Sequence, residues 1–375
     1  MRAGTGSIGV LLYNLGGPWA LDEVEPFLVS LFSDRAIIEL PCGAPMQPLV
    51  ARLIAKIRGP SVRRNYALIG GGSPQLRITR AQAEALEARL NRAPRRCSAP
   101  STPAARNGGT EPDMSGERCF RVFVAMRYSQ PSTDDALTAM AAAGVHRVVS
   151  LTLFPHWSKA TTGSWQTVFH AALRAPQWAR YGFEVSGIDR YPDDAVYLDA
   201  LADTVGRALA AFPPESRDRA VILFSAHGLP RRLVDAGDPY VEDIERTRRG
   251  VLARLTVGNP HRLGYQSRTG PVKWIGPGTD ELIRELGADG VKALLVVPLS
   301  FVSDHIETLY ELDVLFAGLA RQAGIVQYRR SEALNTHPQF IEALARLVER
   351  HLEDATEHAA RQHAYAPGEV MSYEL

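Results

Sequence analysis

The segment Ala293-Leu-Leu-Val-Val-Pro-Leu299 is followed at once by Ser300-Phe-Val-Ser-Asp-His-Ile-Glu-Thr-Leu-Tyr-Glu-Leu-Asp313. The first part is a short apolar run, which is typical of a buried strand. The second part holds acidic and imidazole groups with neither Lys nor Arg among them, and these groups belong to Asp304, His305, Glu307, Glu311 and Asp313. The sequence therefore predicts a buried strand that leads into a strongly acidic helix.

Two interpretations of this acidic helix are open. Asp304 is a candidate N-cap, and Glu307 would complete a capping box three residues later. Acidic residues also favour helix N-termini for electrostatic reasons alone. On the other hand, Asp304, Glu307 and Glu311 share one helical face, where carboxylates can take up protons or hold a hard divalent cation. Capping explains neither Glu311, Asp313 nor the lack of a counter-charge, so the pattern favours a functional site.

Length and composition set the class of protein. The 375 residues suffice for two domains, and 45% hydrophobic with 22% charged residues is ordinary for a globular chain. The formal net charge of +1 gives no indication of nucleic acid as a partner. The cysteines Cys42, Cys97 and Cys119 form no C-x-x-C pair, which favours free thiols in a reducing compartment.

The sequence contains no obvious export or membrane-spanning segment. The first apolar run is short and turns directly into Asn14-Leu-Gly-Gly-Pro18, unlike a secretory signal. No run approaches the roughly 18 apolar residues of a transmembrane helix. We therefore expect a cytoplasmic protein, at most peripheral to the inner face of a membrane. The apolar and then basic segment from Leu40 to Pro60 suits a lip that meets a membrane or an apolar ligand, or else a packed helix with a solvated basic face.

Short apolar runs alternate with helical periodicity along the whole chain. The predicted strands are Ile8–Tyr13, Arg121–Met126, Val145–Phe154, Val185–Asp189, Ala220–Ser225, a short strand closing at Tyr265–Ser267, and Ala293–Leu299. This order predicts an α/β protein with two similar doubly wound, Rossmann-like domains, parallel sheets and a cleft between the domains. We place the first domain at residues 1–189 and the second at 190–330. Residues 91–117, rich in Pro, Ser, Gly, Ala and Arg, are expected to be a surface insertion in the first domain.

Polar groups follow several predicted strands, at the edge where open parallel sheets bind ligands. His227 precedes Gly-Leu-Pro, a turn that would direct its ring toward the cleft; a satisfied core histidine is the alternative. His156 follows another strand, where capping or packing is the simpler interpretation. Arg127 and Tyr128 suit a forked hydrogen bond to a carboxylate, or are an ordinary strand-end pair. Trp274, framed by Pro and Gly, is either core or a stacking surface.

Several motifs are similar to signatures of the ferrochelatase family. They are Ser225-Ala-His-Gly-Leu-Pro230, Gly237-Asp-Pro-Tyr240, Ser303-Asp-His-Ile-Glu-Thr-Leu309, Tyr265-Gln-Ser-Arg268, Gly270-Pro-Val-Lys-Trp274, Gly70-Gly-Gly-Ser-Pro74 and Thr161-Thr-Gly-Ser164. The resemblance runs from about Gly9 to Val348. It implies insertion of Fe²⁺ into protoporphyrin IX, the last step of protoheme synthesis. It also implies a two-domain architecture whose C-terminal helix, residues 331–366, packs back on the first domain.

Matched motif by motif, the resemblance implies a role for each candidate side chain. His227 would be the base that takes the pyrrole protons, Glu307 its acidic partner, and both would contact the metal. Asp304, His305 and Glu311 would continue a polar path for protons or metal. The side chains implied for contact with the macrocycle or its propionates are Arg35, Arg127, Tyr128, Ser164, Trp274 and Leu15.

The chain departs from the family pattern in places. Phe154-Pro-His156-Trp157-Ser158 stands where the family commonly has Tyr-Pro-Gln-Tyr-Ser, so His156 is itself a candidate ligand. Leu15 stands where relatives carry Met or Tyr, which predicts a different pocket wall. Some members hold a 2Fe–2S cluster through four cysteines, three of them at the C-terminus. This chain has three cysteines in total and none in the tail, so we expect no such cluster and no tightly bound cofactor, with Fe²⁺ as a substrate.

Alternative functions stay open at this point. The main rival substrate is coproporphyrin III, although the form Ile306-Glu-Thr-Leu-Tyr-Glu-Leu-Asp313 favours protoporphyrin IX. A non-catalytic tetrapyrrole-binding protein on the same scaffold would be expected to lack His227 or Glu307, and both are present. A doubly wound sugar- or ion-binding protein would lack the paired His and Glu motifs. The oligomeric state does not follow from the sequence.

Overall fold

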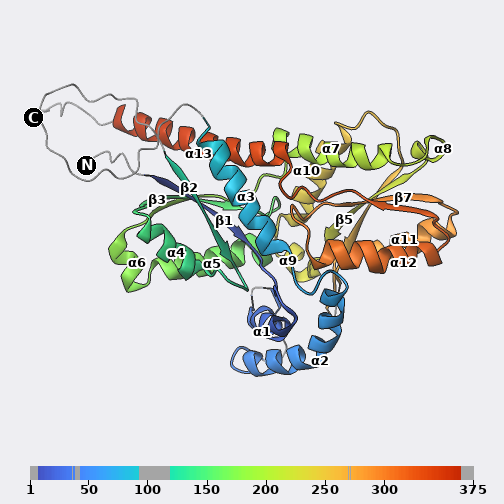
Figure 1. Cartoon of the computed structure of the whole chain (residues 1–375), viewed down its shortest axis with the longest axis horizontal. Coiled ribbons are helices and arrows are strands. Elements are labelled where there is room, and N and C mark those ends of the chain that lie inside the picture. The colour runs from blue at the N-terminus through green and yellow to red at the C-terminus, as the bar shows by residue number, and fades with distance from the viewer. Residues whose placement is uncertain are drawn as a thin grey trace, which may run out of the picture.

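Two four-stranded parallel sheets form the framework of the molecule (Figure 1). The computed structural model describes residues 7–35, 37–38, 43–92, 119–268, 270 and 272–364, with residues 356–364 as backbone only. The first sheet has the order β2-β1-β3-β4 and contains β1 (Ile8–Asn14), β2 (Phe120–Met126), β3 (Arg147–Thr152) and β4 (Glu184–Ile188). The second has the order β6-β5-β7-β8 and contains β5 (Val221–His227), β6 (His261–Gln266), β7 (Ala293–Pro298) and β8 (Gln327–Arg330). The same order occurs twice, which confirms the predicted class of two similar doubly wound α/β halves.

Helices connect successive strands and flank both sheets (Figure 1). Those of the first half are η1 (Leu21–Glu23), α1 (Val24–Ser33), α2 (Gln47–Ala67), α3 (Gln75–Leu90), α4 (Thr133–Ala142), η2 (Lys159–Gly163), α5 (Ser164–Leu173) and α6 (Pro176–Tyr181). Those that follow are α7 (Ala195–Ala210), α8 (Pro214–Arg217), α9 (Arg231–Asp235), α10 (Tyr240–Leu252), α11 (Thr279–Ala288), η3 (Glu307–Phe316), α12 (Ala317–Gln322) and α13 (Pro338–Ala364). Both η2 and η3 are π-helical, a form that is often found at functional sites.

The sequence pattern does not predict strand β8. Its residues, Gln327-Tyr-Arg-Arg330, have no apolar run and are only partly buried. The strand exists because its backbone pairs with β7, in the register Ala293 with Gln327. Pairing with a neighbour is a tertiary effect, which local periodicity does not reveal.

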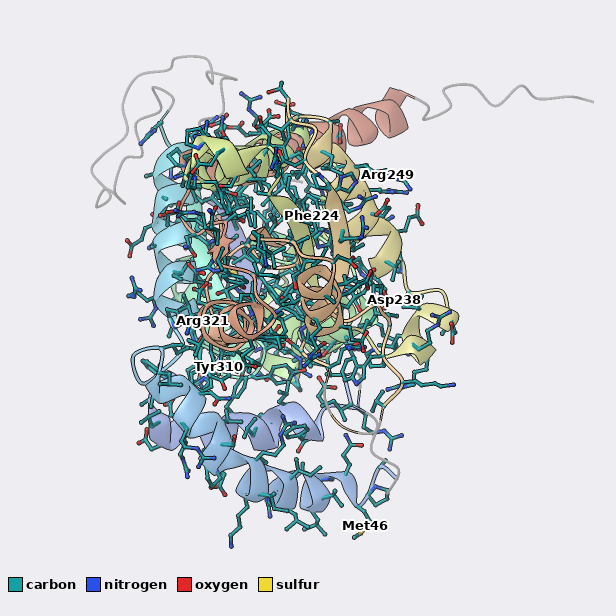
Figure 2. All side chains as sticks on the ribbon, turned by 90° about the vertical axis from the view of Figure 1, so that its right-hand side faces the viewer. Met46, Phe224, Asp238, Arg249, Tyr310 and Arg321 are labelled. Atoms are coloured by element: carbon teal, nitrogen blue, oxygen red, sulfur yellow. The ribbon has the colours of Figure 1, made fainter. Side chains whose placement is uncertain are left out.

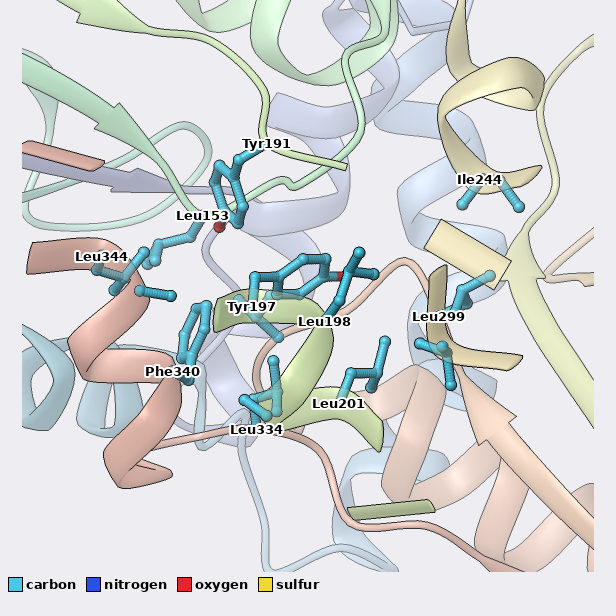
Figure 3. Close-up of a cluster of buried hydrophobic side chains, with 14 of the residues drawn as sticks. Leu153, Tyr191, Tyr197, Leu198, Leu201, Ile244, Leu299, Leu334, Phe340 and Leu344 are labelled. Atoms are coloured by element: carbon cyan, nitrogen blue, oxygen red, sulfur yellow. The ribbon is translucent and has the colours of Figure 1, made fainter. Parts of the chain in front are cut away.

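One large apolar core joins the two halves. Figure 3 shows Tyr197, Leu198 and Leu201 of α7 between Phe340 of α13 on one side and Leu299, just after β7, on the other. All of these side chains are buried, and they belong to one cluster that also includes strand residues of both sheets. Interiors of this kind are close-packed, so the cluster holds the halves in a fixed relation.

The last helix, α13, lies against elements from both halves of the chain. It contacts α3 and β4 of the first half and α7. Arg89 of α3 binds two of its carboxylates, at 2.5 Å from Glu342 and 3.2 Å from Glu349. The predicted domain limits of 1–189 and 190–330 stay predictions. The insertion at 91–117 lies, beyond Asn91 and Arg92, outside the described residues.

Helices α1 and α2 form a pair that projects from one side of the body (Figure 1). Figure 2 shows Met46 at its outer end, far from Phe224 in the second sheet. The pair packs through Leu28, Phe32 and Ala55, and Ile306 joins this cluster from the segment just before η3. The structure thus places the described part of the predicted lip, which lacks residues 40–42, next to the acidic helix. In the described ranges no helix is long and apolar enough to cross a membrane.

Candidate active site

His227 and Glu307 meet at the carboxyl edge of the second sheet. His227 is the last residue of β5, and β5 lies between β6 and β7, the position at which doubly wound sheets bind ligands. Its Nδ1 is 2.7 Å from Oε2 of Glu307, the first residue of η3. The turn after His227 needs a glycine, because a Cβ on Gly228 would lie 2.8 Å from the carbonyl oxygen of Gln266. The His227 side chain is 37% exposed and that of Glu307 21%, so a ligand can reach the imidazole.

Ser267 links the carboxylates of Glu307 and Glu311 in η3. Its hydroxyl is 3.0 Å from Oε2 of Glu307 and 2.5 Å from Oε2 of Glu311, and its backbone N–H donates to Oε1 of Glu311 at 2.8 Å. Ser267 has a φ of 60°, a left-handed conformation that costs a residue other than glycine on the order of 1 kcal/mol or more. Strain of this kind persists where the surroundings impose it. Here the left-handed conformation places both the backbone N–H and the hydroxyl of Ser267 within hydrogen-bond distance of Glu311.

The charges of these groups depend on one another. Burial lowers the pKa of His227, but the charge of Glu307 and their hydrogen bond raise it more, so the net shift is upward. Burial alone would raise the pKa of Glu307, yet the His227 charge and hydrogen bond bring it below its ordinary value. The pKa of Glu311 is raised, first by burial and then by the charge of Glu307. These shifts favour an imidazolium on His227 and a carboxylate on Glu307 once the imidazole has taken up a proton, and of the two carboxyl groups near His227 it is Glu311 whose pKa is raised.

His305 lies beside this pair, whereas Asp304 is engaged elsewhere. His305 Nε2 is 4.0 Å from Oε2 of Glu307, and burial lowers the pKa of its imidazole. Of the two interpretations of Asp304 and Glu307, the capping box is not found, because η3 begins after Ile306 and no side chain caps it. Asp304 instead accepts hydrogen bonds from Thr308 at 2.9 Å and from Asn335 at 2.9 Å.

The acidic segment also has a counter-charge that the sequence did not reveal. Arg330, the last residue of β8, lies 3.2 Å from Asp304 and 2.7 Å from Asp313. The side chain of Arg330 is 12% exposed and that of Asp304 18%, so this ion pair is largely buried, whereas Asp313 is 36% exposed and its pair with Arg330 lies at the surface. The absence of a nearby cation in the sequence was therefore not a sign of free carboxylates at Asp304 and Asp313. Glu307 and Glu311 remain as the carboxylates that face His227.

A second polar group lies at the edge of the first sheet. Arg127, Tyr128 and Ser164 all hydrogen-bond to one oxygen of Asp34, Oδ2, at 2.6, 2.6 and 2.8 Å. The forked contact predicted for Arg127 and Tyr128 therefore has a partner in the chain itself. Sequence reasoning missed Asp34 and chose its neighbour Arg35, which is exposed after the end of α1.

The helix pair α1–α2 lies near both polar groups. Phe27 of α1 packs edge-on against Tyr128, with ring centroids 6.5 Å apart. Tyr66 of α2 lies close enough to Glu307 for that charge to add to the rise that burial causes in its pKa. The two groups therefore flank one structural feature, although each belongs to a different sheet.

The other predicted residues have clear places. Leu15 directly follows β1, is half-buried, and accepts a hydrogen bond from the backbone N–H of Tyr128 at 3.0 Å. Trp274 bridges to Pro230 in the turn after His227 and is also half-buried. His156 is buried between the halves, where its Nε2 is 2.9 Å from Oγ1 of Thr247 and burial lowers its pKa to about 3.

Sequence reasoning missed the residues that support His227. The backbone N–H of His227 donates to Oγ of Ser300 at 2.9 Å, and the hydroxyl of Tyr240 lies 2.6 Å from the same Oγ. Tyr240 also donates to the carbonyl oxygen of His227 at 3.0 Å. Gln266 donates to the carbonyl oxygen of Glu307 at 3.1 Å. Tyr240, Gln266 and Ser267 lie within the quoted motifs, so the signal was present without an assigned role.

No resident metal centre is evident in the part of the chain that the structure describes, where no three His, Cys, Asp or Glu side chains gather as a metal site. Two surface cavities, of about 340 and 590 Å³, lie elsewhere, beside β2 and α4 and beside α7. The expectations of no 2Fe–2S cluster and of a cleft at His227 stay predictions.

The fold and the site define a protein of two doubly wound α/β halves with an acid–base pair at a strand edge. The solved structure of SirB from Bacillus subtilis with Fe³⁺ matches with a TM-score of 0.50 and 12% identity, over 92% of this chain and 94% of that one, a likeness of fold alone. A sequence model of the Ferrochelatase family matches residues 7–352. The protein named Ferrochelatase in Geotalea uraniireducens is 46% identical over 341 residues, 91% of this chain and 97% of the relative. Its namesake in Synechocystis is 43% identical over 93% of this chain and 84% of its own. The chain belongs to the ferrochelatase family.

Proposed function

We propose that this chain is a metal chelatase that inserts Fe²⁺ into protoporphyrin IX, giving protoheme and two protons as a step of heme biosynthesis. The observation that carries the proposal is the contact of 2.7 Å between His227 Nδ1 and Glu307 Oε2 at the switch point of the second sheet. Metal insertion must remove two pyrrole protons, and an imidazole is suited to accept them near neutral pH. Membership of the family supports the reaction, and the named relatives support it further.

The hydrogen bonds suggest how the protons leave. Nδ1 of His227 faces Glu307, so Nε2 is the nitrogen that would accept a pyrrole proton. The Nδ1 proton can then pass to Glu307, whose charge stabilises the imidazolium. Ser267, 3.0 Å from Glu307 and 2.5 Å from Glu311, connects this carboxylate to the next one. Glu311 and the neighbouring His305 are the proposed continuation of the path, whereas Asp304 is held by Arg330.

The first half would grip the macrocycle. Arg127, Tyr128 and Ser164 are fixed by Asp34, and such preorganised groups can hold a ring in a bent form. Bending exposes the nitrogen lone pairs to the metal, and roughly 1–5 kcal/mol of such strain can come from remote binding contacts. We also propose that Leu15 and Trp274 contact the ring and that Arg35 meets a propionate.

The test is anaerobic metal insertion by the purified chain, followed by the absorbance of the product. His227→Ala should abolish insertion while protoporphyrin IX still binds, as judged by its fluorescence. Undiminished insertion by this variant would overturn the role of His227. Binding by the unaltered chain without any insertion would instead favour a tetrapyrrole-binding protein.

Substrate choice needs its own measurement. Protoporphyrin IX carries two propionates and coproporphyrin III four, so kcat/KM for the two porphyrins separates the alternatives. We expect a higher kcat/KM for protoporphyrin IX. A clear preference for coproporphyrin III would make that porphyrin the proposed substrate instead.

The helix α2 suggests contact with a membrane surface. Leu49, Leu53 and Ile57 are 56%, 58% and 69% exposed and recur every four residues, so they form an apolar stripe. The helix contains five cations and no acidic residue. Apolar stripes with cationic flanks bind anionic interfaces, so we propose a cytoplasmic chain that is peripheral to the inner face of a membrane. Sedimentation with anionic vesicles tests the membrane contact, and Leu53→Glu should reduce the fraction of protein that sediments. Equal sedimentation of this variant and the unaltered chain would contradict the proposal.

A further inference from the structure

One carboxylate bridges the two halves beside the proposed site. Asp238 lies in the short connection between α9 and α10 (Figure 2). Its Oδ1 accepts from the backbone N–H of Tyr240 at 3.1 Å, within the second half. Its Oδ2 accepts from the hydroxyl of Ser158 at 2.9 Å and from the backbone N–H of Lys159 at 2.8 Å, both in the first half. Each oxygen of Asp238 therefore serves a different half of the molecule.

Each end of this bridge continues to one of the two polar groups. On the second half, Tyr240 binds the carbonyl of His227 and lies against Ser300, which in turn receives the N–H of His227. On the first half, the hydroxyl of Ser158 also accepts from the backbone N–H of Ala160 and so caps η2. The residue directly after η2 is Ser164, which binds Asp34.

A second carboxylate holds the same first-half segment. Asp243 of α10 is fully buried, and its Oδ2 accepts from the backbone N–H of Trp157 at 3.1 Å. Its Oδ1 lies 3.2 Å from Arg190, which follows β4. Three consecutive first-half residues, Trp157 to Lys159, thus depend on acceptors from the segment that contains Tyr240.

We propose that Asp238 is a positioning residue that sets the separation between His227 and the Arg127–Ser164 group. This inference rests on the proposed function, because it assumes that one porphyrin contacts both groups. A flat ligand held from two sides is sensitive to their spacing, and a displacement of about 1 Å can cost up to 10²-fold in rate. Asp238 touches neither His227 nor Glu307, so the protonation of that pair should not depend on it.

The experiment compares Asp238→Ala with Asp235→Ala in metal insertion by the full-length chain. Asp235 is a matched control three residues away, since its ion pair is with Arg231 on the exposed face of α9. We expect Asp238→Ala to raise the porphyrin KM about tenfold, and to weaken porphyrin binding in the fluorescence assay equally. The acid limb of the pH profile should not move, and Asp235→Ala should match the unaltered chain.

A milder variant keeps the test decisive if Asp238→Ala does not fold. Ser158→Ala removes one of the two first-half donors and leaves the bond from Tyr240 intact, so about a threefold rise in KM is expected. An unchanged porphyrin KM in both variants would overturn the inference. A fall in kcat that only matches the loss of folded protein, with KM unchanged, would overturn it as well. Failure of the unaltered chain to insert iron would overturn the proposed function instead. The fluorescence measurement would then still decide whether Asp238 affects porphyrin binding.

Discussion

His227 Nδ1 lies 2.7 Å from Glu307 Oε2 although the two residues are 80 positions apart. They meet because β5 and β7 are neighbours in the second sheet, and parallel strands end at one edge. Glu307 follows β7 by way of Ser300, whose hydroxyl receives the N–H of His227. The sheet itself therefore brings together the imidazole and the carboxylate.

The first prediction concerns the pH profile of Glu307→Gln. The pKa of His227 is raised above its ordinary 6.5 because Glu307 outweighs burial, so the unaltered chain should gain kcat/KM as pH rises through a value above 6.5. Gln removes that charge, burial then dominates, and the acid limb should move below 6.5 while kcat falls by about 10². Rates of insertion between pH 5 and 9 measure both effects. An unmoved limb would show that another group controls it.

The second prediction concerns the protonation of Glu311. A hydroxyl has a single proton, so the two short contacts of Ser267 are satisfied together when Glu311 is protonated and donates to it. The pKa of Glu311 is raised by burial and by Glu307, which favours that form. Glu311→Gln should therefore change the free energy of unfolding by less than about 1 kcal/mol, and Glu311→Ala should cost about 2 kcal/mol. Denaturant unfolding measures both variants. Equal losses of unfolding free energy in Glu311→Gln and Glu311→Ala would count against a protonated Glu311.

The third prediction separates the two polar groups. Asp34→Asn removes the negative charge that three donors share, so Arg127 and Ser164 should lose their fixed positions. We expect a rise of about tenfold in the porphyrin KM with no movement of the acid limb, because His227 and Glu307 lie in the other half. Glu25→Gln in α1, the helix that ends just before Asp34, is the control, since the ion pair of Glu25 with Arg63 is exposed. A shifted limb would mean that the groups are not independent.

Most of the fold could be predicted from local patterns. Strands such as β1 and β7 are continuous apolar runs because both of their faces are covered, and β5 follows the same rule. Their alternation with amphipathic helices then fixes a parallel arrangement. Strand β8 was not predicted because only pairing with β7 makes it a strand. For the same reason, the counter-charge that its Arg330 supplies was not predicted either.

For the candidate site, the sequence could predict the types of side chain but not how they pair in space. His227 and Glu307 were identifiable by type and motif, but the sequence could not show which carboxylate would face which cation. Asp304 and Glu311 look alike in sequence, yet Arg330 neutralises the first and Ser267 orients the second. Asp34 was missed because its three partners lie far along the chain, just after the ends of β2 and of η2. Partner choice is a tertiary property, and acidic runs alone do not encode it.

The last prediction tests the role of Arg330. This arginine binds Asp304 at 3.2 Å and Asp313 at 2.7 Å on either side of Glu307 and Glu311, and its side chain is 12% exposed. Arg330→Met keeps most of the apolar stem but leaves the largely buried carboxylate of Asp304 without its cation, which should cost about 3 kcal/mol of unfolding free energy. Arg284→Met is the matched control: its pair with Asp280 is an exposed contact four residues apart on one helix, worth roughly 0.3–0.5 kcal/mol. Urea unfolding measures both variants. The Arg330 variant should also lose insertion activity, because Arg330 no longer binds the carboxylates on either side of Glu307 and Glu311. Equal losses of stability in the two variants would show that the contacts of Arg330 contribute no more than a surface pair does.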